Sequence, residues 1–173
     1  MIDASQCPMT AATATARIES PIGIIALTAT STALTAVHIL THQSGERLFD
    51  NHPVLSVATT QMRDYFAGTC FEFSLPLQNL ESADGKQLRA GIASIPYGQT
   101  LTYGALAKQL GSAARAVGQA CKTNPYPIII PCHRVISTAG REYYSGGDGP
   151  RTKTWLLDFE YDHLSPDKRT RLL

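Results

Sequence analysis

The first half of the chain alternates short hydrophobic stretches with turn residues, a pattern typical of strands. Residues 16–19, 23–30 and 34–40 are rich in Ile, Val, Leu and Thr, which favour extended backbone. A proline and a glycine lie between the first two stretches, within residues 20–23. The pattern therefore predicts three consecutive strands, with a tight turn after the first.

A helix is predicted after these strands. Pro53 suits the first helical turn, where its missing N–H needs no partner, and Gly68 is suited to end the helix. Between them, hydrophobic residues keep a roughly helical spacing at Leu55, Met62, Tyr65 and Phe66.

The following segment is predicted to return to extended structure and then to leave the first domain. Phe71, Phe73 and Leu75 alternate with polar residues, as in a half-buried strand. Residues 78–85 are polar and lack aliphatic periodicity, so they are the candidate linker. We predict an α/β domain over residues 1–84 and a second domain over residues 85–173.

The second domain shows helical periodicity. Leu88, Ile92 and Ile95 repeat as i, i+4, i+7, which predicts a helix that ends at the proline and glycine of residues 96–98. Thr102 is suited to cap a further helix that ends before Gly111.

A third helix is predicted over residues 113–122, after a very short turn. Two short helices joined by a tight turn form a helix-turn-helix candidate. The spacing alone favours an ordinary helical hairpin, so both interpretations stay open at this point.

Composition places the chain among globular proteins. Its 173 residues are 43% hydrophobic and 17% charged, and no apolar run is long enough to cross a bilayer. Residues 1–15 have no basic start and no long apolar stretch, so we expect a loose leader rather than a signal peptide. A cytoplasmic protein is expected, or a nuclear one in a eukaryote.

Charge is distributed unevenly between the two halves. Residues 1–84 carry 3 basic and 8 acidic side chains, a net of −5, whereas residues 85–173 carry 12 basic and 6 acidic, a net of +6. A basic half beside an acidic half suggests that only the second half meets a polyanion.

The cysteines do not indicate a metal site. They show no CxxC pairing and no close grouping with histidines, so no metal ligand set is predicted. Free thiols are expected for all four, and chemistry is expected only at the last: Cys7, Cys70, Cys121 and Cys132.

The segment around Cys132 carries the clearest chemical signal. Three consecutive isoleucines, Ile128 to Ile130, are bounded by prolines and predict a short buried strand. Cys132 and His133 follow directly, and a nearby base favours the thiolate that acts as nucleophile. Adjacent side chains on extended backbone point to opposite sides, so we expect any contact between them to be indirect.

This segment resembles the O6-alkylguanine-DNA alkyltransferase family, and the similarity extends over most of the chain. The nucleophile motif is Pro131-Cys132-His133-Arg134-Val135, preceded by Asn124-Pro125 and three aliphatics. Further matches are Ser20-Pro21-Ile22-Gly23, Gln61 with Tyr65-Phe66-Ala67-Gly68, Ile95-Pro96-Tyr97-Gly98, Tyr103, Ala114-Arg115-Ala116-Val117-Gly118, Tyr144-Ser145-Gly146-Gly147 and Trp155-Leu156-Leu157.

The resemblance implies a suicide DNA-repair reaction. Cys132 would take an alkyl group from O6 of guanine by in-line displacement. His133 would withdraw the thiol proton through a water, Glu160 would orient His133, and Asn124 would brace the turn that carries the nucleophile. Tyr103 would crowd a phosphate and supply a proton to the departing guanine.

The resemblance also implies a pocket for a flipped base, because the O6 alkyl group lies inside the duplex. Tyr144, Ser145 and Cys121 would line this pocket, and the backbone of Val135 would accept from the exocyclic amine. Arg115 would fill the vacated place in the stack from the minor groove. The remaining DNA-contacting residues would be Ala113, Ala114, Ala116, Gly118, Tyr103 and Thr138.

Without the family, most of these residues have plainer interpretations. The small residues around Arg115 suit tight helix packing, Glu160 suits a surface carboxylate, and Tyr103 and Tyr144 suit half-buried packing. Departures from the family pattern lie around the pocket rather than at the nucleophile. The turn before Arg115 is short, and residues 148–150 look like an insertion.

The resemblance implies a ribonuclease H-like N-terminal domain and a mainly helical, winged-helix-like C-terminal domain with a helix-turn-helix. A monomer that acts on double-stranded DNA containing O6-alkylguanine, without a cofactor, is expected. Three alternatives stay open: a non-enzymatic lesion-binding relative, a transcription regulator and a cysteine hydrolase. The lesion-binding relatives lack the acceptor cysteine, which argues against the first.

Overall fold

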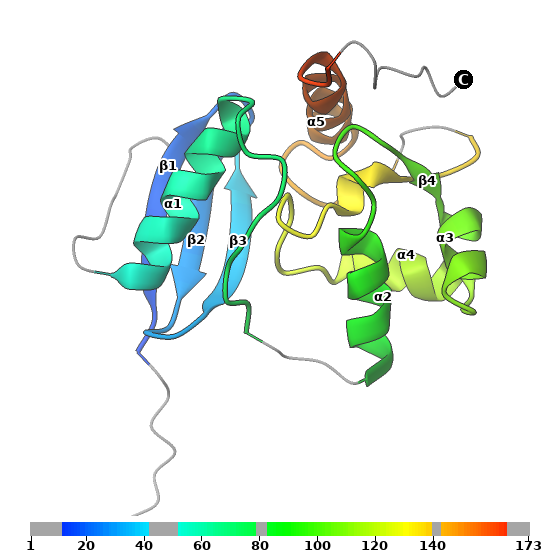
Figure 1. Cartoon of the computed structure of the whole chain (residues 1–173), viewed down its shortest axis with the longest axis horizontal. Coiled ribbons are helices and arrows are strands. Elements are labelled where there is room, and N and C mark those ends of the chain that lie inside the picture. Colours follow the sequence, from blue (N-terminus) through cyan, green and yellow to red (C-terminus); the bar gives the residue numbers. More distant parts are fainter. Residues whose placement is uncertain (1–11, 42–51, 79–82, 140–142, 166–173) are drawn as a thin grey trace, which may run out of the picture.

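The computed structural model describes residues 12–41, 52–78, 83–139 and 143–165. A three-stranded sheet with one covering helix forms one side of the molecule, and the remaining helices form the other (Figure 1). Within the described ranges, no helix combines the length and apolar character that a membrane span requires.

The sheet consists of β1 (Ala14–Ser20), β2 (Gly23–Ala29) and β3 (Leu34–Leu40), joined antiparallel in sequence order. Ser20 pairs with Gly23 across the first turn. Gly23 adopts a φ of +111°, and a Cβ there would meet the Leu40 carbonyl oxygen at 2.5 Å, so the turn requires glycine. The three predicted strands are confirmed.

Helix α1 (Pro53–Phe66) packs on this sheet, as predicted. The His52 side chain accepts a hydrogen bond from Leu55 N and caps the helix start. Gly68 follows the helix end with a φ of +74°, a left-handed conformation that favours glycine.

The strand predicted at residues 71–75 is wrong. Phe73, Leu75 and Leu77 are half-buried in alternation, but only Leu77 forms a bridge, to Leu34 at the start of β3. The bridge is parallel, so residues 71–75 would run beside the residues before Leu34, where β3 has not yet begun. Beyond the bridge, Val37 N–H donates to Pro125 O at 2.8 Å, so a later segment occupies that part of the β3 edge.

Two predicted irregular segments are shorter than expected. Residues 1–11 of the predicted leader lie outside the described residues, but Ala14 and Thr15 already pair in β1. Residues 79–82 of the predicted linker also lie outside them, and helix α2 (Ala83–Ala93) begins before the predicted linker ends. Strand pairing and helix formation thus reach into both segments.

The second part of the chain is mainly helical. Thr102 caps α3 through a hydrogen bond that its hydroxyl accepts from Ala105 N, as predicted. The elements are α2 (Ala83–Ala93), β4 (Leu101–Thr102), α3 (Tyr103–Gln109), α4 (Ala114–Lys122), the 3-10 helix η1 (Cys132–Arg134), β5 (Val135–Ile136) and α5 (Pro150–Asp162).

β4 and β5 form a short parallel ladder next to two residues of the candidate site. Leu101 pairs with Val135, and Thr102 with Ile136. Tyr103 follows β4 directly, and η1 with Cys132 precedes β5 directly. Because the pairing is parallel, Tyr103 and Cys132 lie beyond opposite ends of the ladder. Both nevertheless line one cavity, although 29 residues separate them in sequence.

The strand predicted at the three isoleucines is also wrong, because this segment forms a turn. Ile130 N donates to Tyr126 O at 2.8 Å, and the Asn124 side chain bonds both Tyr126 N and Ile130 O. Ile128 has a φ of +74°, a strained conformation for a β-branched residue. The run of isoleucines therefore reflects the burial of this turn and not the pairing of a strand in a sheet.

One hydrophobic core runs through both parts of the chain. Hydrogen bonds also join them, beyond the bond from Val37 to Pro125. The Tyr126 hydroxyl lies 3.2 Å from Leu34 O and 2.8 Å from Gln78 O. The turn before Cys132 is thereby fixed directly to the first part of the chain.

Candidate active site

Cys132 begins η1 at the end of the buried turn, with 5% of its surface exposed. Asn124 Nδ2 lies 3.2 Å from Cys132 Sγ and 2.8 Å from Ile130 O. One amide therefore contacts both the turn and the sulfur. An indirect contact between Cys132 and His133 was expected because adjacent side chains on extended backbone point to opposite sides. The two residues instead lie in a 3-10 helical turn, so that reason does not apply.

Burial raises the pKa of the Cys132 thiol, and the hydrogen bond from Asn124 and the charge of Lys153 oppose this only in part. The resting group at neutral pH is therefore a thiol rather than a thiolate. A reaction that needs the thiolate has to remove the proton, which requires a nearby base.

His133 and Glu160 form a fully buried pair. The His133 Nε2 atom lies 2.7 Å from Glu160 Oε1, and both side chains are 0% exposed. Burial lowers the pKa of His133 despite the opposing effect of Glu160, so its imidazole is neutral at neutral pH. Nε2 then carries the proton donated to Glu160, and Nδ1 is left as an acceptor.

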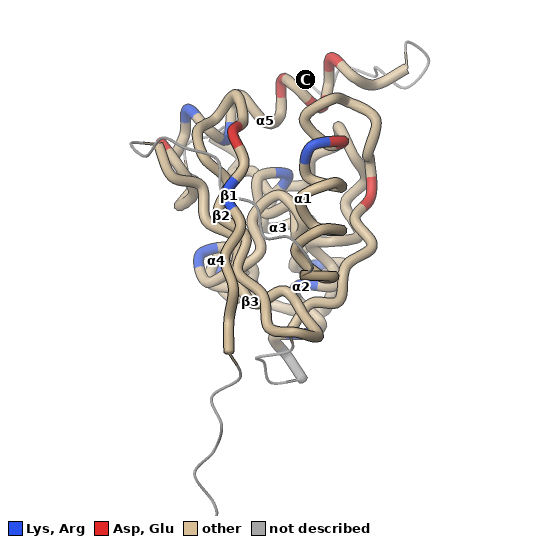
Figure 2. Tube along the Cα trace, turned by 90° about the vertical axis from the view of Figure 1, so that its left-hand side faces the viewer, with Lys and Arg blue, Asp and Glu red and all other residues tan. Residues whose placement is uncertain are grey.

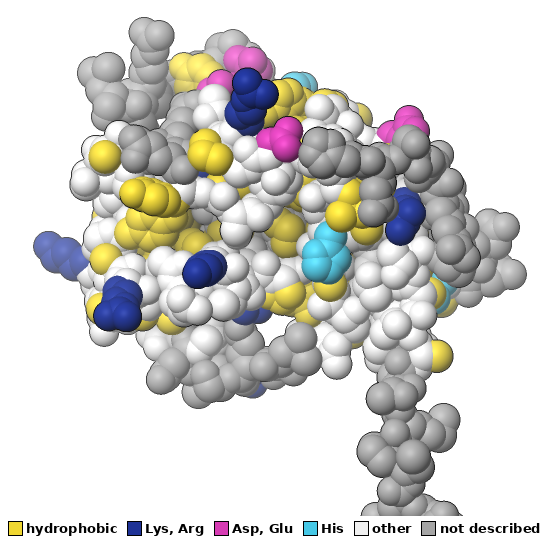
Figure 3. Space-filling view, turned by 180° about the vertical axis from the view of Figure 1, so that it is seen from behind, with side chains coloured by type: hydrophobic (Ala, Val, Ile, Leu, Met, Phe, Trp, Pro, Cys, Tyr) yellow, Lys and Arg dark blue, Asp and Glu magenta, His cyan; other side chains and the backbone are white. Residues whose placement is uncertain are grey.

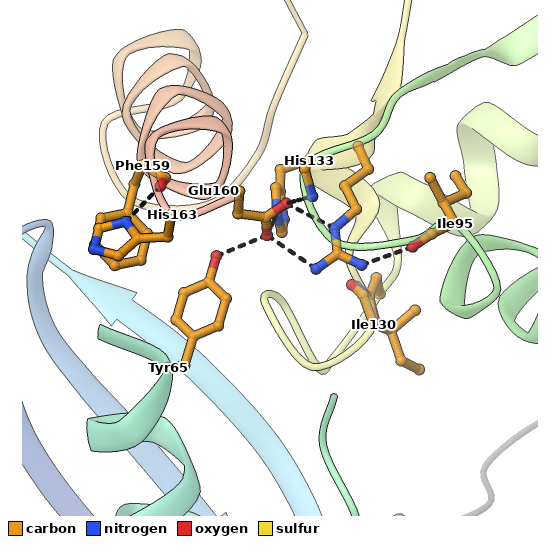
Figure 4. A network of polar contacts seen from close by, with 10 residues as sticks. Tyr65, Ile95, Ile130, His133, Phe159, Glu160 and His163 are labelled. Atoms are coloured by element: carbon orange, nitrogen blue, oxygen red, sulfur yellow. Dashed lines mark hydrogen bonds and ion pairs between the residues drawn. The ribbon is translucent and has the colours of Figure 1, made fainter. Parts of the chain in front are cut away.

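Several donors hold the Glu160 carboxylate in an ionised form (Figure 4). Arg134 Nε and Nη2 lie 2.9 and 3.0 Å from its two oxygens, and Gly98 N donates to Oε2 at 3.0 Å. The Tyr65 hydroxyl donates to Oε1 at 2.8 Å. Burial tends to raise the pKa of Glu160, but His133 and Arg134 outweigh it and hold the pKa well below its usual range.

A cavity of about 630 Å³ opens beside the thiol, large enough for a small organic group. Its lining combines α3, α4, η1 and the segment before α5. The lining residues are Tyr103, Ala114, Gly118, Cys121, Lys122, Cys132, Tyr143, Tyr144 and Ser145.

The two tyrosines predicted for the site remain protonated at neutral pH. Burial, together with Cys121 and Cys132, raises the pKa of Tyr103 to about 12. Burial also raises the pKa of Tyr144 well above its usual value. Each hydroxyl can therefore donate a hydrogen bond, and that of Tyr144 is buried without a partner among the described residues.

Lys153 is a site residue that the sequence analysis missed. It is 0% exposed, and its Nζ donates to Val135 O at 2.7 Å and to Tyr143 O at 2.9 Å. On α5 the buried residues Lys153, Leu156, Leu157 and Glu160 follow an i, i+3, i+4, i+7 pattern, with Thr152 buried beside them. The sequence signal for a buried role was the presence of two charged residues, Lys153 and Glu160, at positions where a helix normally carries hydrophobic residues.

We expect Lys153→Met to lower the free energy of unfolding by about 1–3 kcal/mol for each of the two carbonyl acceptors left unpaired. Lys108→Met on the exposed face of α3 is the matched control and should change it by no more than about 0.5 kcal/mol. Urea unfolding at unchanged m-value measures both. Equal small effects would show that the Lys153 contacts contribute nothing to the fold.

A basic, small-residue face lies next to the cavity. Lys108, Arg115 and Lys122 are exposed on α3 and α4, and neither helix carries an acidic residue. Figure 2 shows α4 with basic positions, and the view from behind in Figure 3 shows Lys and Arg side chains beside an exposed hydrophobic area. This side of the molecule is suited to a polyanion.

The structure brings the predicted residues into two groups around the thiol. The first group does not line the cavity: Asn124 contacts the sulfur, and His133, the residue after Cys132, pairs with Glu160. Glu160 is buried rather than the surface carboxylate that its sequence alone suggested. Seven predicted residues line the cavity: Tyr103, Ala114, Gly118, Cys121, Cys132, Tyr144 and Ser145.

The other predicted residues do not line this cavity. Ala113, Arg115 and Thr138 are exposed, Ala116 is half-buried, and the side chain of Val135 is buried. Besides Lys153, four residues of the site were not predicted from the sequence. They are the lining residues Lys122 and Tyr143 and the Glu160 partners Arg134 and Tyr65.

Two family profiles match the chain. The profile described as 6-O-methylguanine DNA methyltransferase, ribonuclease-like domain, matches residues 14–79. The profile described as 6-O-methylguanine DNA methyltransferase, DNA binding domain, matches residues 86–161. The first part of the chain is therefore a ribonuclease-like domain and the second a DNA-binding domain.

Relatives named methylated-DNA--protein-cysteine methyltransferase are similar over most of the chain. The protein from Mycobacterium tuberculosis (strain ATCC 25618 / H37Rv) is 38% identical over 156 residues, which are 87% of this chain and 93% of the relative. The protein from Methanosarcina acetivorans is 37% identical over 150 residues, covering 82% and 94%.

Solved structures give the same result. The crystal structure of Mycobacterium tuberculosis O6-methylguanine methyltransferase has a TM-score of 0.76 at 34% identity and covers 90% of this chain and 97% of that one. The structure of Mycobacterium tuberculosis OGT in complex with DNA has a TM-score of 0.73 at 36% identity, covering 87% and 94%. The chain therefore belongs to the 6-O-methylguanine DNA methyltransferase family.

Proposed function

We propose that this protein repairs double-stranded DNA by transferring an alkyl group from O6 of guanine to the sulfur of its own Cys132. The observation that carries the proposal is the position of Cys132 between the cavity and the buried His133–Glu160 pair. A site for the alkyl donor on one side and a base on the other are what a thiol alkylation requires. A lesion-binding relative without an acceptor cysteine is not favoured.

The reaction is a single in-line displacement. The Cys132 Sγ–carbon bond forms while the carbon–O6 bond breaks, and guanine leaves with the electron pair. The thiol proton passes through a water to His133 Nδ1, and the resulting imidazolium is stabilised by Glu160. The Tyr103 hydroxyl supplies a proton to the departing guanine and then takes one from solvent, because its pKa of about 12 disfavours the phenolate. The His133 imidazolium returns its proton to solvent, so the net change is the exchange of the alkyl group for the thiol proton. The thioether is stable, so each molecule reacts once.

The flipped base is held in the cavity beside Cys132. Tyr144 and Ser145 donate to its edge, and Cys121 contacts its face. The Val135 carbonyl accepts from the exocyclic amine. That oxygen already accepts from Lys153 Nζ, and a carbonyl oxygen has two lone pairs. Lys153 therefore orients an acceptor as well as contributing positive charge near the thiol.

DNA is contacted by the basic face of the second domain. α3 and α4 act as a helix-turn-helix within a winged-helix-like domain, and Arg115 inserts from the minor groove in place of the flipped base. The small residues Ala113, Ala114, Ala116 and Gly118 allow close approach, and Thr138 and Tyr103 contact the backbone. Affinity falls steeply with salt, because phosphate contacts dominate such binding.

The finer architecture is part of the same proposal. The first domain is ribonuclease H-like, the division falls between residues 84 and 85, and the protein acts as a monomer. Its specificity is for O6-alkylguanine. The completeness of the site within one chain, which supplies the thiol, the relay and the cavity, supports a monomer.

Intact-protein mass spectrometry tests the proposal. After incubation with a duplex containing O6-methylguanine, the protein should gain a single methyl mass, and peptide mapping should place it on Cys132. Repaired duplex should equal protein added. Repeated turnover, or the label on Cys121, would overturn the suicide mechanism, and an unmodified protein that still binds the lesion would restore the lesion-binding alternative.

A further inference from the structure

A tyrosine hydroxyl of the ribonuclease-like domain reaches the relay behind Cys132. Tyr65, near the end of α1, donates to Glu160 Oε1 at 2.8 Å, although 95 residues separate the two in sequence. Both side chains are 0% exposed. The bond also ends on the same oxygen that receives the His133 Nε2 hydrogen. Figure 4 shows Tyr65 pointing from α1 into the network.

The ring of Tyr65 is fixed by its neighbours. Its centroid lies 5.2 Å from that of Phe66, 5.7 Å from Phe73, 6.0 Å from Tyr97 and 5.8 Å from Phe159. Burial and the adjacent Glu160 raise the pKa of Tyr65 well above its usual value. The hydroxyl is therefore a permanent donor in a fixed place, whereas a loosely packed tyrosine would be able to turn away.

We propose that Tyr65 is a positioning residue of the alkyl transfer, whose hydroxyl sets the basicity of His133 through Glu160. The inference rests on the proposed function, because it assumes that His133 accepts the thiol proton. Its consequence is that the ribonuclease-like domain regulates the chemistry of the second domain without touching the substrate.

The direction of the effect follows from the sharing of one oxygen. Oε1 accepts from Tyr65, His133 and Arg134. A hydroxyl that donates to Oε1 withdraws negative charge from it and weakens its hold on the His133 proton. Removing the hydroxyl concentrates that charge and makes the imidazolium more stable. The acid limit of the reaction, where His133 is already protonated and cannot act as a base, then moves to higher pH.

Removal of the hydroxyl should leave Glu160 in place. Arg134 bonds both carboxylate oxygens, and Gly98 N bonds Oε2. The other titratable and charged groups that influence this network are Arg134, Tyr97, Lys153, Tyr144 and Cys132. None of these side chains changes in a Tyr65 variant, so a shift of the pH profile reports the hydroxyl.

The experiment measures the rate of Cys132 alkylation by free O6-benzylguanine between pH 5 and 9 in the full chain. In Tyr65→Phe the acid midpoint should rise by about one pH unit, the size expected for a hydrogen bond to a charged group. Tyr65 replaced by 3-fluorotyrosine, a stronger donor, should move it the opposite way. NMR titration of the His133 ring nitrogens should show the same two shifts.

Tyr126→Phe is the matched control. It also removes a buried hydroxyl that joins the two domains, but this hydroxyl bonds Leu34 O and Gln78 O rather than Glu160. Its acid midpoint should stay at the wild-type value, whatever its effect on stability. Equal shifts in Tyr65→Phe and Tyr126→Phe, or an unmoved midpoint in both Tyr65 variants, would overturn the inference.

A His133→Ala variant separates this inference from the proposed function. If His133→Ala reacts at the wild-type rate, the relay itself fails, and the role of Tyr65 fails with it. If His133→Ala is slow but neither Tyr65 variant moves the midpoint, the relay stands and Tyr65 only supports the fold.

Discussion

Alkyl transfer should slow by about two to four orders of magnitude in His133→Ala, the usual contribution of a positioned general base. The remaining reaction depends on unassisted ionisation of Cys132. Because burial raises the pKa of that thiol, the rate should then rise only at pH values above the wild-type range. Lesion binding should be retained, since His133 is fully buried and does not line the cavity.

Glu160→Gln should lower the rate less than His133→Ala. Because the carboxylate stabilises the His133 imidazolium, its loss should also move the acid limit of the reaction to lower pH. The double variant should be little slower than His133→Ala, because both residues act in one chain. Independent, additive losses would mean that Glu160 serves only the structure. Unchanged pH profiles in both single variants would remove the relay from the mechanism.

A stability control is essential for the Glu160 variant. Arg134 is buried and bonds both carboxylate oxygens, so Glu160→Gln leaves a buried charge without its partner. Breaking such a pair typically costs about 3–5 kcal/mol. Rates should therefore be compared at a temperature where denaturant titration shows that both variants are folded.

Arg115→Ala should impair repair of a duplex lesion far more than reaction with free O6-benzylguanine. The side chain is exposed at the start of α4, outside the cavity lining, and its proposed role is to fill the stack after the base leaves. A free base needs no flipping, so it bypasses that role. Single-turnover rates on the two substrates measure the difference.

Lys108→Ala is the control for charge alone. Lys108 is also exposed and basic, but it lies on α3. Its loss should weaken duplex binding in a salt-dependent way and leave the ratio between the two substrates close to wild type. If Arg115→Ala slows the reactions with the duplex and with the free base equally, the proposed role of Arg115 in filling the place of the flipped base is contradicted.

The sequence was sufficient where local signals and tertiary structure agree. The three strands of the sheet follow from their β-branched residues, and the starts of α1 and α3 follow from Pro53 and Thr102. The isoleucine run failed because hydrophobicity reports burial and not conformation. Its turn depends on a side chain, Asn124, whose bonds to the backbone no periodicity reveals.

The site was predictable only where a family motif named its residues. Cys132, His133 and Glu160 come together as the resemblance implied, although 27 residues separate the last two. Tyr65 and Lys153 were missed because each lies in a hydrophobic stripe of its helix and looks like packing. Their polar ends meet partners from other elements, and one sequence alone does not show such partners.

The burial of Cys132 has a consequence for how long an unused molecule stays competent. A nucleophile that reacts once is lost equally to a peroxide or to a stray electrophile. Such reagents attack exposed thiolates, whereas this sulfur is 5% exposed and held as a thiol. The protein therefore keeps its single nucleophile in an unreactive form until a substrate binds. Selectivity for damaged DNA thus begins with the protection of the sulfur from peroxides and stray electrophiles.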